Sequence, residues 1–139
     1  MSTASAPATV LVFSHRPEVR AAVRTALGTH PAADVGPLSY LECSTVDEVV
    51  AAVDAGHADL CVLDGEAQPT GGLGIGRQLK HEIEQCPPVV VLIARQADRW
   101  LAHWSMADAT LAHPVDPLVA PEVVAGLLRS RVVRPSLRG

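Results

Sequence analysis

Length, composition and charge describe one globular domain. The chain has 139 residues, of which 48% are hydrophobic, 19% charged and 3% aromatic, so we expect a single core of aliphatic side chains. The formal net charge is −4. Four of the eleven basic residues are arginines near the C-terminal end. The rest of the chain therefore has seven basic residues and all fifteen acidic ones. Such an acidic body repels a phosphate backbone, so we expect no nucleic acid among the partners.

Cysteine usage and hydropathy favour a cytoplasmic protein. The three cysteines, Cys43, Cys61 and Cys86, form no C-x-x-C pair, which is typical of core residues in a reducing compartment. Residues 1–7 lack the features of an export signal, and no apolar run reaches the length of a membrane span. We therefore expect a protein that is not embedded in a membrane.

Five predicted strands alternate with five predicted helices. The strands are expected at 9–13, 38–44, 59–63, 89–93 and 110–112, and the helices at 17–27, 46–55, 73–85, 97–107 and 117–129. Thr45 and Glu48 have capping-box spacing. Asp116 precedes a proline and is expected to be the N-cap of the last helix.

This alternation predicts an α/β fold with one domain at 8–129, between a disordered N-terminus at 1–7 and a basic flexible tail at 130–139. Right-handed crossovers place helices on both faces of a parallel sheet. The flavodoxin-like, doubly wound arrangement has strand order 2-1-3-4-5, and its ligands meet the carboxyl ends of the strands between the first and third. We therefore expect Ser14, His15 and Asp64 to converge at one edge of the sheet.

Asp64 after the third strand, the end of the fourth strand at Ile93, and His113-Pro114 after the fifth together resemble bacterial response-regulator receiver domains, which are CheY-like, over residues 8–129. The resemblance implies two acids after the first strand, a phosphoaccepting aspartate after the third, a hydroxyl after the fourth and a lysine after the fifth. In receivers the acids and the aspartate hold Mg²⁺, while the hydroxyl and the lysine bind the phosphoryl oxygens.

Only Asp64, the phosphoacceptor equivalent, matches this pattern. We predict a degenerate pocket around it that consists of Ser14, His15, Glu66, Ile93 and His113. Mg²⁺ discriminates against imidazole, and an alkyl side chain cannot donate to a phosphoryl oxygen. We therefore expect no phosphorylation, no metal, no cofactor and no catalytic residue, and hence a protein that is not an enzyme. The alternative is a phosphoaccepting single-domain response regulator of a two-component system that uses Asp64.

A closer likeness lies in five short segments. They are Asp64-Gly65-Glu66-Ala67, Pro69-Thr70-Gly71-Gly72, Cys86-Pro87-Pro88, Trp100-Leu101-Ala102 with Trp104-Ser105, and His113-Pro114-Val115-Asp116-Pro117. Together they are similar to actinobacterial stand-alone receiver-like proteins linked to respiratory NADH-quinone oxidoreductase, complex I. This likeness implies a pseudo-receiver that is an accessory or regulatory subunit, with the hydrophilic arm of complex I as partner and a peripheral place at the inner membrane.

Two tryptophans indicate a surface for a protein partner. Trp100 and Trp104 lie four residues apart, hence on one face of the predicted fourth helix, and tryptophan is favoured at interface hot spots. They could also cover the core beside the fourth strand. In receivers the fourth helix, fifth strand and fifth helix form dimers and bind output partners. We therefore predict a partner face, which could also form a homodimer, of Trp100, His103, Trp104, Thr110 and Pro114.

Two further readings concern small ligands. The run Gly71–Gly76 has neither the dinucleotide fingerprint nor a P-loop, and is expected instead to form a loop with positive φ. A metal site of His15, His113 and Asp64 is geometrically conceivable, although hydrogen bonding of the imidazoles is the plainer account. An enzyme or small-ligand sensor that uses the vacated pocket remains an alternative to a binding subunit.

Overall fold

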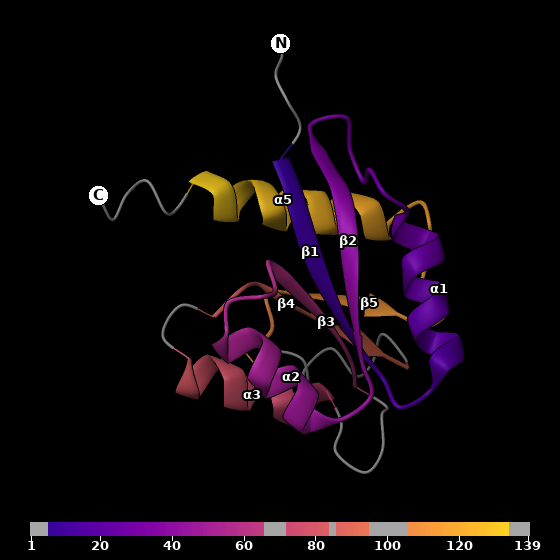
Figure 1. Cartoon of the computed structure of the whole chain (residues 1–139). Helices are drawn as coiled ribbons and strands as arrows, with labels where there is room; N and C mark the ends of the chain where they lie inside the picture. Colours follow the sequence, from indigo (N-terminus) through magenta and orange to yellow (C-terminus); the bar gives the residue numbers. More distant parts are fainter. Residues whose placement is uncertain (1–5, 66–71, 84–85, 95–105, 134–139) are drawn as a thin grey trace.

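The computed structural model describes residues 6–65, 72–83, 86–94 and 106–133, which form a sheet with helices on both faces (Figure 1). The strands are β1 (Ala6–Phe13), β2 (Val35–Cys43), β3 (Leu60–Asp64), β4 (Val89–Ile93) and β5 (Ala109–Ala112). The helices are α1 (Pro17–Leu27), α2 (Val46–Asp54), α3 (Gly72–Glu82) and α5 (Ala120–Val133). No helix in this part of the chain is long and apolar enough to cross a membrane.

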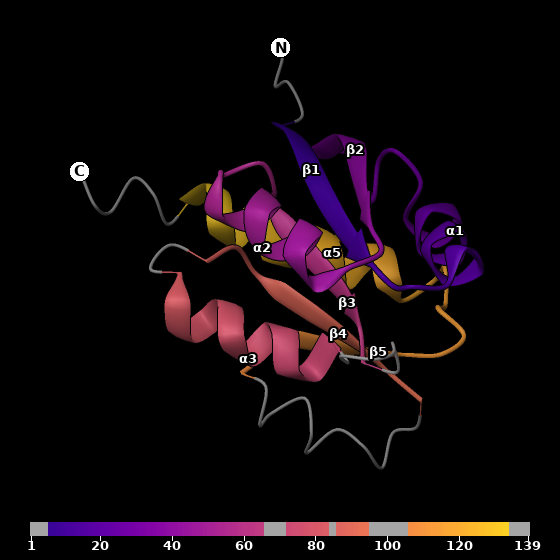
Figure 2. The ribbon, with the colours of Figure 1, turned by 60° about the horizontal axis from the view of Figure 1, so that its bottom comes forward.

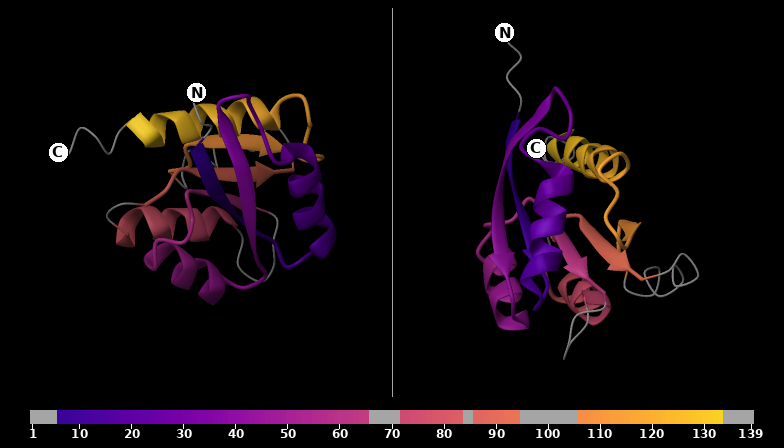
Figure 3. Two further views of the ribbon diagram at one scale, coloured as in Figure 1. Left: turned by 45° about the horizontal axis from the view of Figure 1, so that its top comes forward. Right: turned by 90° about the vertical axis from the view of Figure 1, so that its right-hand side faces the viewer.

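The sheet confirms the predicted topology. Its five strands lie in the order β2-β1-β3-β4-β5, and every neighbouring pair is parallel. Figure 2 shows α2 and α3 on one side of the strands, and Figure 3 shows α1 and α5 together on the other. The chain is thus a flavodoxin-like, doubly wound α/β domain, because helices connect parallel strands across both faces.

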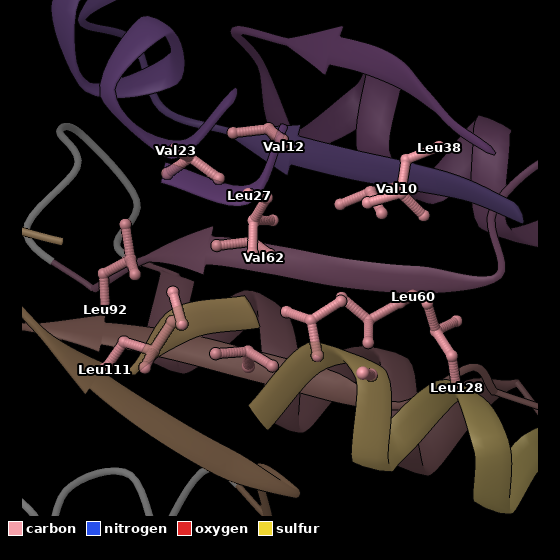
Figure 4. Packing of buried hydrophobic residues seen from close by; sticks show 14 of the residues in the cluster. Val10, Val12, Val23, Leu27, Leu38, Leu60, Val62, Leu92, Leu111 and Leu128 are labelled. Carbon is pink, nitrogen blue, oxygen red and sulfur yellow. The ribbon is translucent and has the colours of Figure 1, made fainter. Parts of the chain in front are cut away.

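The two faces of the sheet have separate apolar cores. β3 and β4 are buried along their whole length, so alternate side chains enter opposite cores. Val62 and Leu92 belong to the cluster under α1 and α5, which Figure 4 shows in detail. Leu63 and Val91 belong to the cluster under α2 and α3. This double burial explains why both strands are continuous apolar runs in the sequence.

Local signals set the ends of α1 and α2 as predicted. α1 has Pro17 in its first turn, and Gly28 follows it with φ 64°. At α2 the Thr45 hydroxyl accepts from the Glu48 N–H, and the Glu48 carboxylate accepts from the Thr45 N–H. Backbone N–H groups of Ser44 and Thr45 that donate to this carboxylate hold the pKa of Glu48 below its ordinary value. Both helices can therefore be predicted from sequence alone.

Apart from α5, three strand and helix boundaries differ from the prediction by three residues, and several others by one. β1 begins at Ala6, inside the segment expected to be disordered, and β2 begins at Val35 rather than at residue 38. These early residues have neighbours in the sheet, since Ala6 pairs with Val35. α3 ends at Glu82, three residues before the predicted end.

The start of α5 was predicted wrongly. Asp116 closes a turn instead of capping the helix: its Oδ1 accepts from the Leu118 N–H at 2.8 Å, and its carbonyl accepts from the Ala120 N–H at 2.9 Å. The helix then runs from Ala120 to Val133, so that the first four residues of the expected flexible tail are helical. Packing of Val124 and Leu128 on the sheet holds this helix in place.

The glycine-rich segment also differs from the expected loop. Gly72, Gly74 and Gly76 lie within α3, and none of them has positive φ. Gly71 lies outside the described residues, as does nearly all of the predicted fourth helix at 97–107. Residues 106 and 107, the last two of this predicted helix, are not helical, and Met106 lies in a turn with φ 65°.

Candidate functional site

The carboxyl ends of the parallel strands bring three predicted site residues together. Ser14 directly follows β1, Asp64 is the last residue of β3, and His113 directly follows β5. β1, β3, β4 and β5 all end on the same side of the molecule (Figure 2). The convergence follows from the topology, since parallel strands with crossover helices place all their carboxyl ends at one edge.

Asp64 is a buried carboxylate that is surrounded by groups of the protein itself. The Ser14 hydroxyl donates to its Oδ2 at 2.8 Å, and Nη2 of Arg16 lies 3.5 Å from the same oxygen. Nε2 of His113 lies 3.4 Å from Oδ1. Asp64 and Ser14 are both 0% exposed, and they are the only buried polar or charged residues in the described part of the chain. Both oxygens of Asp64 therefore have a polar protein neighbour.

Backbone and side-chain contacts hold the loop after β1. Ser14 donates its N–H to the Cys43 carbonyl at 3.2 Å, and its hydroxyl accepts from the Arg16 N–H at 3.1 Å. Arg20 on α1 donates from Nη1 to the Ser14 carbonyl at 2.6 Å. On the other side of Asp64, the His113 N–H donates to the Ile93 carbonyl at 2.9 Å. These hydrogen bonds thus fix the site residues to the ends of the strands.

Arg16 is a site residue that sequence reasoning missed. Its guanidinium lies beside the Asp64 carboxylate, where it supplies a positive charge, and its side chain is 41% exposed. In the sequence, Arg16 lies two residues after Ser14, in the loop that follows β1, and this position was the available signal because β1 neighbours β3. A guanidinium suits such a place, because it stays charged and presents several donors to a carboxylate.

The described groups around Asp64 are not the ligands that Mg²⁺ prefers. In the described residues, no group of three or more histidine, cysteine, aspartate or glutamate side chains could hold a metal ion. Mg²⁺ prefers oxygen ligands in octahedral geometry, whereas the groups around Asp64 are a guanidinium, an imidazole and a hydroxyl. A cation at Asp64 would also be repelled by Arg16 at short range.

The nearby cysteine is not an activated nucleophile. Burial raises the pKa of the Cys43 thiol to about 11, and the negative charge of Glu48 adds to this shift, while Arg20 opposes it. The thiol is therefore protonated at neutral pH, and only the thiolate is a good nucleophile.

The remaining predicted residues have different places. Ile93 packs in the apolar cluster under α2 and α3. His15 and Pro114 are exposed, and Thr110 is half-buried on β5. The peptide bond between His113 and Pro114 is cis. Four predicted residues lie outside the described part of the chain: Glu66, Trp100, His103 and Trp104.

Comparison of the sequence with known proteins identifies the family. No family model matches the chain. An uncharacterized response regulatory protein, found in each of two strains of Mycobacterium tuberculosis, is 45% identical over 130 residues, which is 94% of this chain and 98% of the relative. The chain belongs to the response-regulator receiver family. Because the identity extends over nearly both full lengths, the assignment concerns the whole receiver domain.

Solved receiver structures share the fold at low sequence identity. A CheY-like receiver domain protein from Methanospirillum hungatei has a TM-score of 0.71 and 14% identity, covering 91% of this chain and 97% of that one. The receiver domain of a Francisella response regulator has a TM-score of 0.73 and 16% identity, covering 88% and 98%. These likenesses show that the receiver has the CheY-like fold.

Proposed function

We propose that this receiver works by binding another protein, without phosphorylation of Asp64 and without enzymatic activity. The observation that carries the proposal is the environment of Asp64. This carboxylate is 0% exposed, with a hydroxyl and a guanidinium at Oδ2 and an imidazole at Oδ1. A phosphoryl acceptor needs an accessible carboxylate oxygen that can approach the phosphorus atom. Internal partners at both oxygens oppose that approach.

The other positions around Asp64 support the same proposal. Stabilising a transferred phosphoryl group needs charged or hydrogen-bonding groups at its oxygens. Ile93 has no side-chain donor and packs in an apolar cluster, and His113 is already next to Asp64. Asp64 therefore acts as a structural anion that fixes the ends of β1, β3 and β5.

We expect no modification of Asp64 in a titration with beryllofluoride or acetyl phosphate and Mg²⁺. The backbone amide resonances of residues 64 and 65 should stay unchanged in NMR spectra, and the intact mass should stay that of the unmodified chain. The reason is that the carboxylate keeps its contacts with Ser14 and Arg16.

Two variants control this titration. Asp64→Asn removes the acceptor, so any mass increase that it retains arises elsewhere. A variant with Ser14→Asp, His15→Asp, Ile93→Thr and His113→Lys restores the residue types that active receivers need, and a response from it shows that the assay detects activation. A saturable response of the unaltered chain that is lost in Asp64→Asn would make it a phosphoaccepting response regulator instead.

As the partner we propose complex I, with the receiver as an accessory or regulatory subunit at its hydrophilic arm. This part depends on the resemblance of five sequence segments to stand-alone receiver-like proteins of actinobacteria. The two relatives at 45% identity come from Mycobacterium tuberculosis, an actinobacterium, which supports that resemblance. The predicted face of Trp100, His103, Trp104, Thr110 and Pro114 would form the contact.

Affinity purification from the source organism tests the partner. Tagged receiver is expected to recover complex I subunits. The Trp104→Ala variant is expected to lose most of them, since hot-spot tryptophans contribute about 2 kcal/mol or more. The Asp64→Asn variant is expected to retain them. Quantitative mass spectrometry of the recovered proteins is the measurement. Recovery of unrelated proteins alone would refute complex I as the partner, and full recovery by Trp104→Ala would refute the tryptophan face.

A further inference from the structure

The outer edge of β2 offers backbone groups for pairing. β2 is the first strand of the sheet and pairs only with β1 among the described strands. The Cys43 carbonyl accepts from the Ser14 N–H, so the backbone of Cys43 faces β1. Backbone groups of successive residues in a strand point to opposite edges. The N–H and C=O groups of Tyr40 and Glu42 therefore point away from β1.

The loop before β2 covers only the first part of this edge. The Leu38 N–H faces outward and donates to the Thr29 carbonyl at 2.8 Å. The outward groups of Tyr40 and Glu42 lie beyond this cover. An unpaired edge of this kind can accept an added strand.

A groove lies beside the open edge, between α1 and β2, which run side by side in Figures 1 and 3. Its volume is about 450 Å³, within the range of ligand sites. The lining residues are Ala21, Arg24, Thr25, Gly28, Thr29, Leu38 and Tyr40. Side chains of a strand added to β2 would alternate between the two faces of the sheet, so every second one would point towards this groove.

Aromatic and hydroxyl groups shape the groove. The Tyr40 hydroxyl donates to the Gly28 carbonyl, and the guanidinium of Arg24 lies 5.9 Å from the centre of the tyrosine ring. Burial raises the pKa of Tyr40 to about 12, so the phenol keeps its proton and this hydrogen bond. Tyr40 is thus held in a fixed orientation along the groove.

Arg24 is the charged residue in the lining of the groove, and two arginines beside one glutamate give its surroundings an excess of positive charge. Nε of Arg20 lies 3.0 Å from one oxygen of Glu42, and Nη1 of Arg24 lies 2.9 Å from the other. Two guanidinium groups therefore share one carboxylate. Arg24 is 51% exposed and retains further N–H donors. On a chain whose net charge is −4, this local excess favours a partner that carries carboxylates.

We propose that an extended acidic segment of a partner protein adds to β2 as a further strand. Its backbone would pair with Tyr40 and Glu42, one carboxylate would bind Arg24, and an apolar side chain would lie over Leu38 in the groove. The proposal concerns a different surface from the predicted tryptophan face. It does not need the proposed function, since the edge is available whether or not Asp64 is phosphorylated.

An NMR titration with a capped octapeptide tests this docking. Threonine takes every odd position of this peptide, and glutamate and valine take turns at the even positions, so that glutamate and valine side chains share one face of the added strand. Saturable shifts are expected at the amides of Tyr40 and Glu42 and along the α1 side of the groove, with slower amide exchange at the two strand residues. The same peptide with lysine in place of glutamate should bind roughly tenfold more weakly or not at all, because charge-assisted hydrogen bonds to Arg24 would be lost.

Two matched variants sharpen the result. Arg24→Gln should weaken binding of the glutamate peptide roughly tenfold, whereas Arg77→Gln on α3 makes the same charge change on the opposite face and should leave it unaltered. Equal binding of both peptides, shifts confined to other elements, or no saturable shift would overturn the proposal. So would concentration-dependent self-association through β2 without peptide, since a second copy would then occupy the edge.

Discussion

Replacing Gly36 with alanine is expected to lower the free energy of unfolding by roughly 2–4 kcal/mol. Gly36 has φ 121°, which L-residues rarely adopt, and a Cβ there would lie 2.5 Å from the Thr29 carbonyl oxygen and 2.9 Å from Cδ2 of His30. Thr29 is held by the hydrogen bond from Leu38, so relief of the clash would disturb the cover of the β2 edge. Urea denaturation followed by circular dichroism measures the loss.

Gly126→Ala is the matched control for Gly36→Ala. Gly126 is exposed within α5, and a Cβ built on it meets nothing within 4 Å. Alanine is therefore expected to raise the free energy of unfolding by about 0.5–1 kcal/mol, because it is the better helix former. If both variants lost stability equally, the explanation from positive φ and close contact at Gly36 would be wrong.

Ser14→Ala is expected to lower the free energy of unfolding by about 1.5–3 kcal/mol. The Ser14 hydroxyl donates to a carboxylate that is 0% exposed, and alanine would remove this donor at 2.8 Å while the contact of Asp64 Oδ2 with Arg16 is longer, at 3.5 Å. The loss of a hydrogen-bond partner is costly for a buried charge, because water cannot replace that partner. Thermal and urea unfolding of the variant check the expected loss.

A double-mutant cycle separates this hydrogen bond from other effects of Ser14. In an Asp64→Asn background the cost of Ser14→Ala should fall by about 1 kcal/mol or more, since the charged acceptor is gone. Ser39→Ala is the control, because Ser39 is exposed on β2 and its replacement should change stability by at most about 0.5 kcal/mol. Purely additive losses at Ser14 and Asp64 would contradict the structural role of the pair.

These expectations connect the site to the fold. In the described part of the chain, Asp64 and Ser14 are the only buried polar or charged residues, and they join the ends of β1 and β3 at the place where receivers perform phosphoryl chemistry. A buried, hydrogen-bonded carboxylate stabilises one arrangement of these strand ends. Under the proposed phosphorylation-independent function, this edge of the sheet would be a rigid base for protein-binding surfaces.

Much of this architecture could be predicted because its signals are local. β3 and β4 are apolar runs that are buried on both faces, and Pro17, Gly28, Thr45 and Glu48 mark helix ends through contacts with their own neighbours in the chain. The order of strands followed from the five-stranded flavodoxin-like arrangement that this alternation of strands and helices favours. The convergence of Ser14, Asp64 and His113 followed in turn from that order.

Long-range contacts decided the rest. Arg16 became a partner of Asp64, 48 residues away in sequence, because β1 and β3 lie side by side. Asp116 closes a turn before α5, which begins at Ala120 and packs on the sheet. The sequence by itself determined the α/β class, the strand order and the residues at the sheet edge. Only the tertiary structure decided which groups neutralise the buried carboxylate and how much of the outer edge of β2 the preceding loop covers, since both depend on contacts that form when the segments pack on the cores.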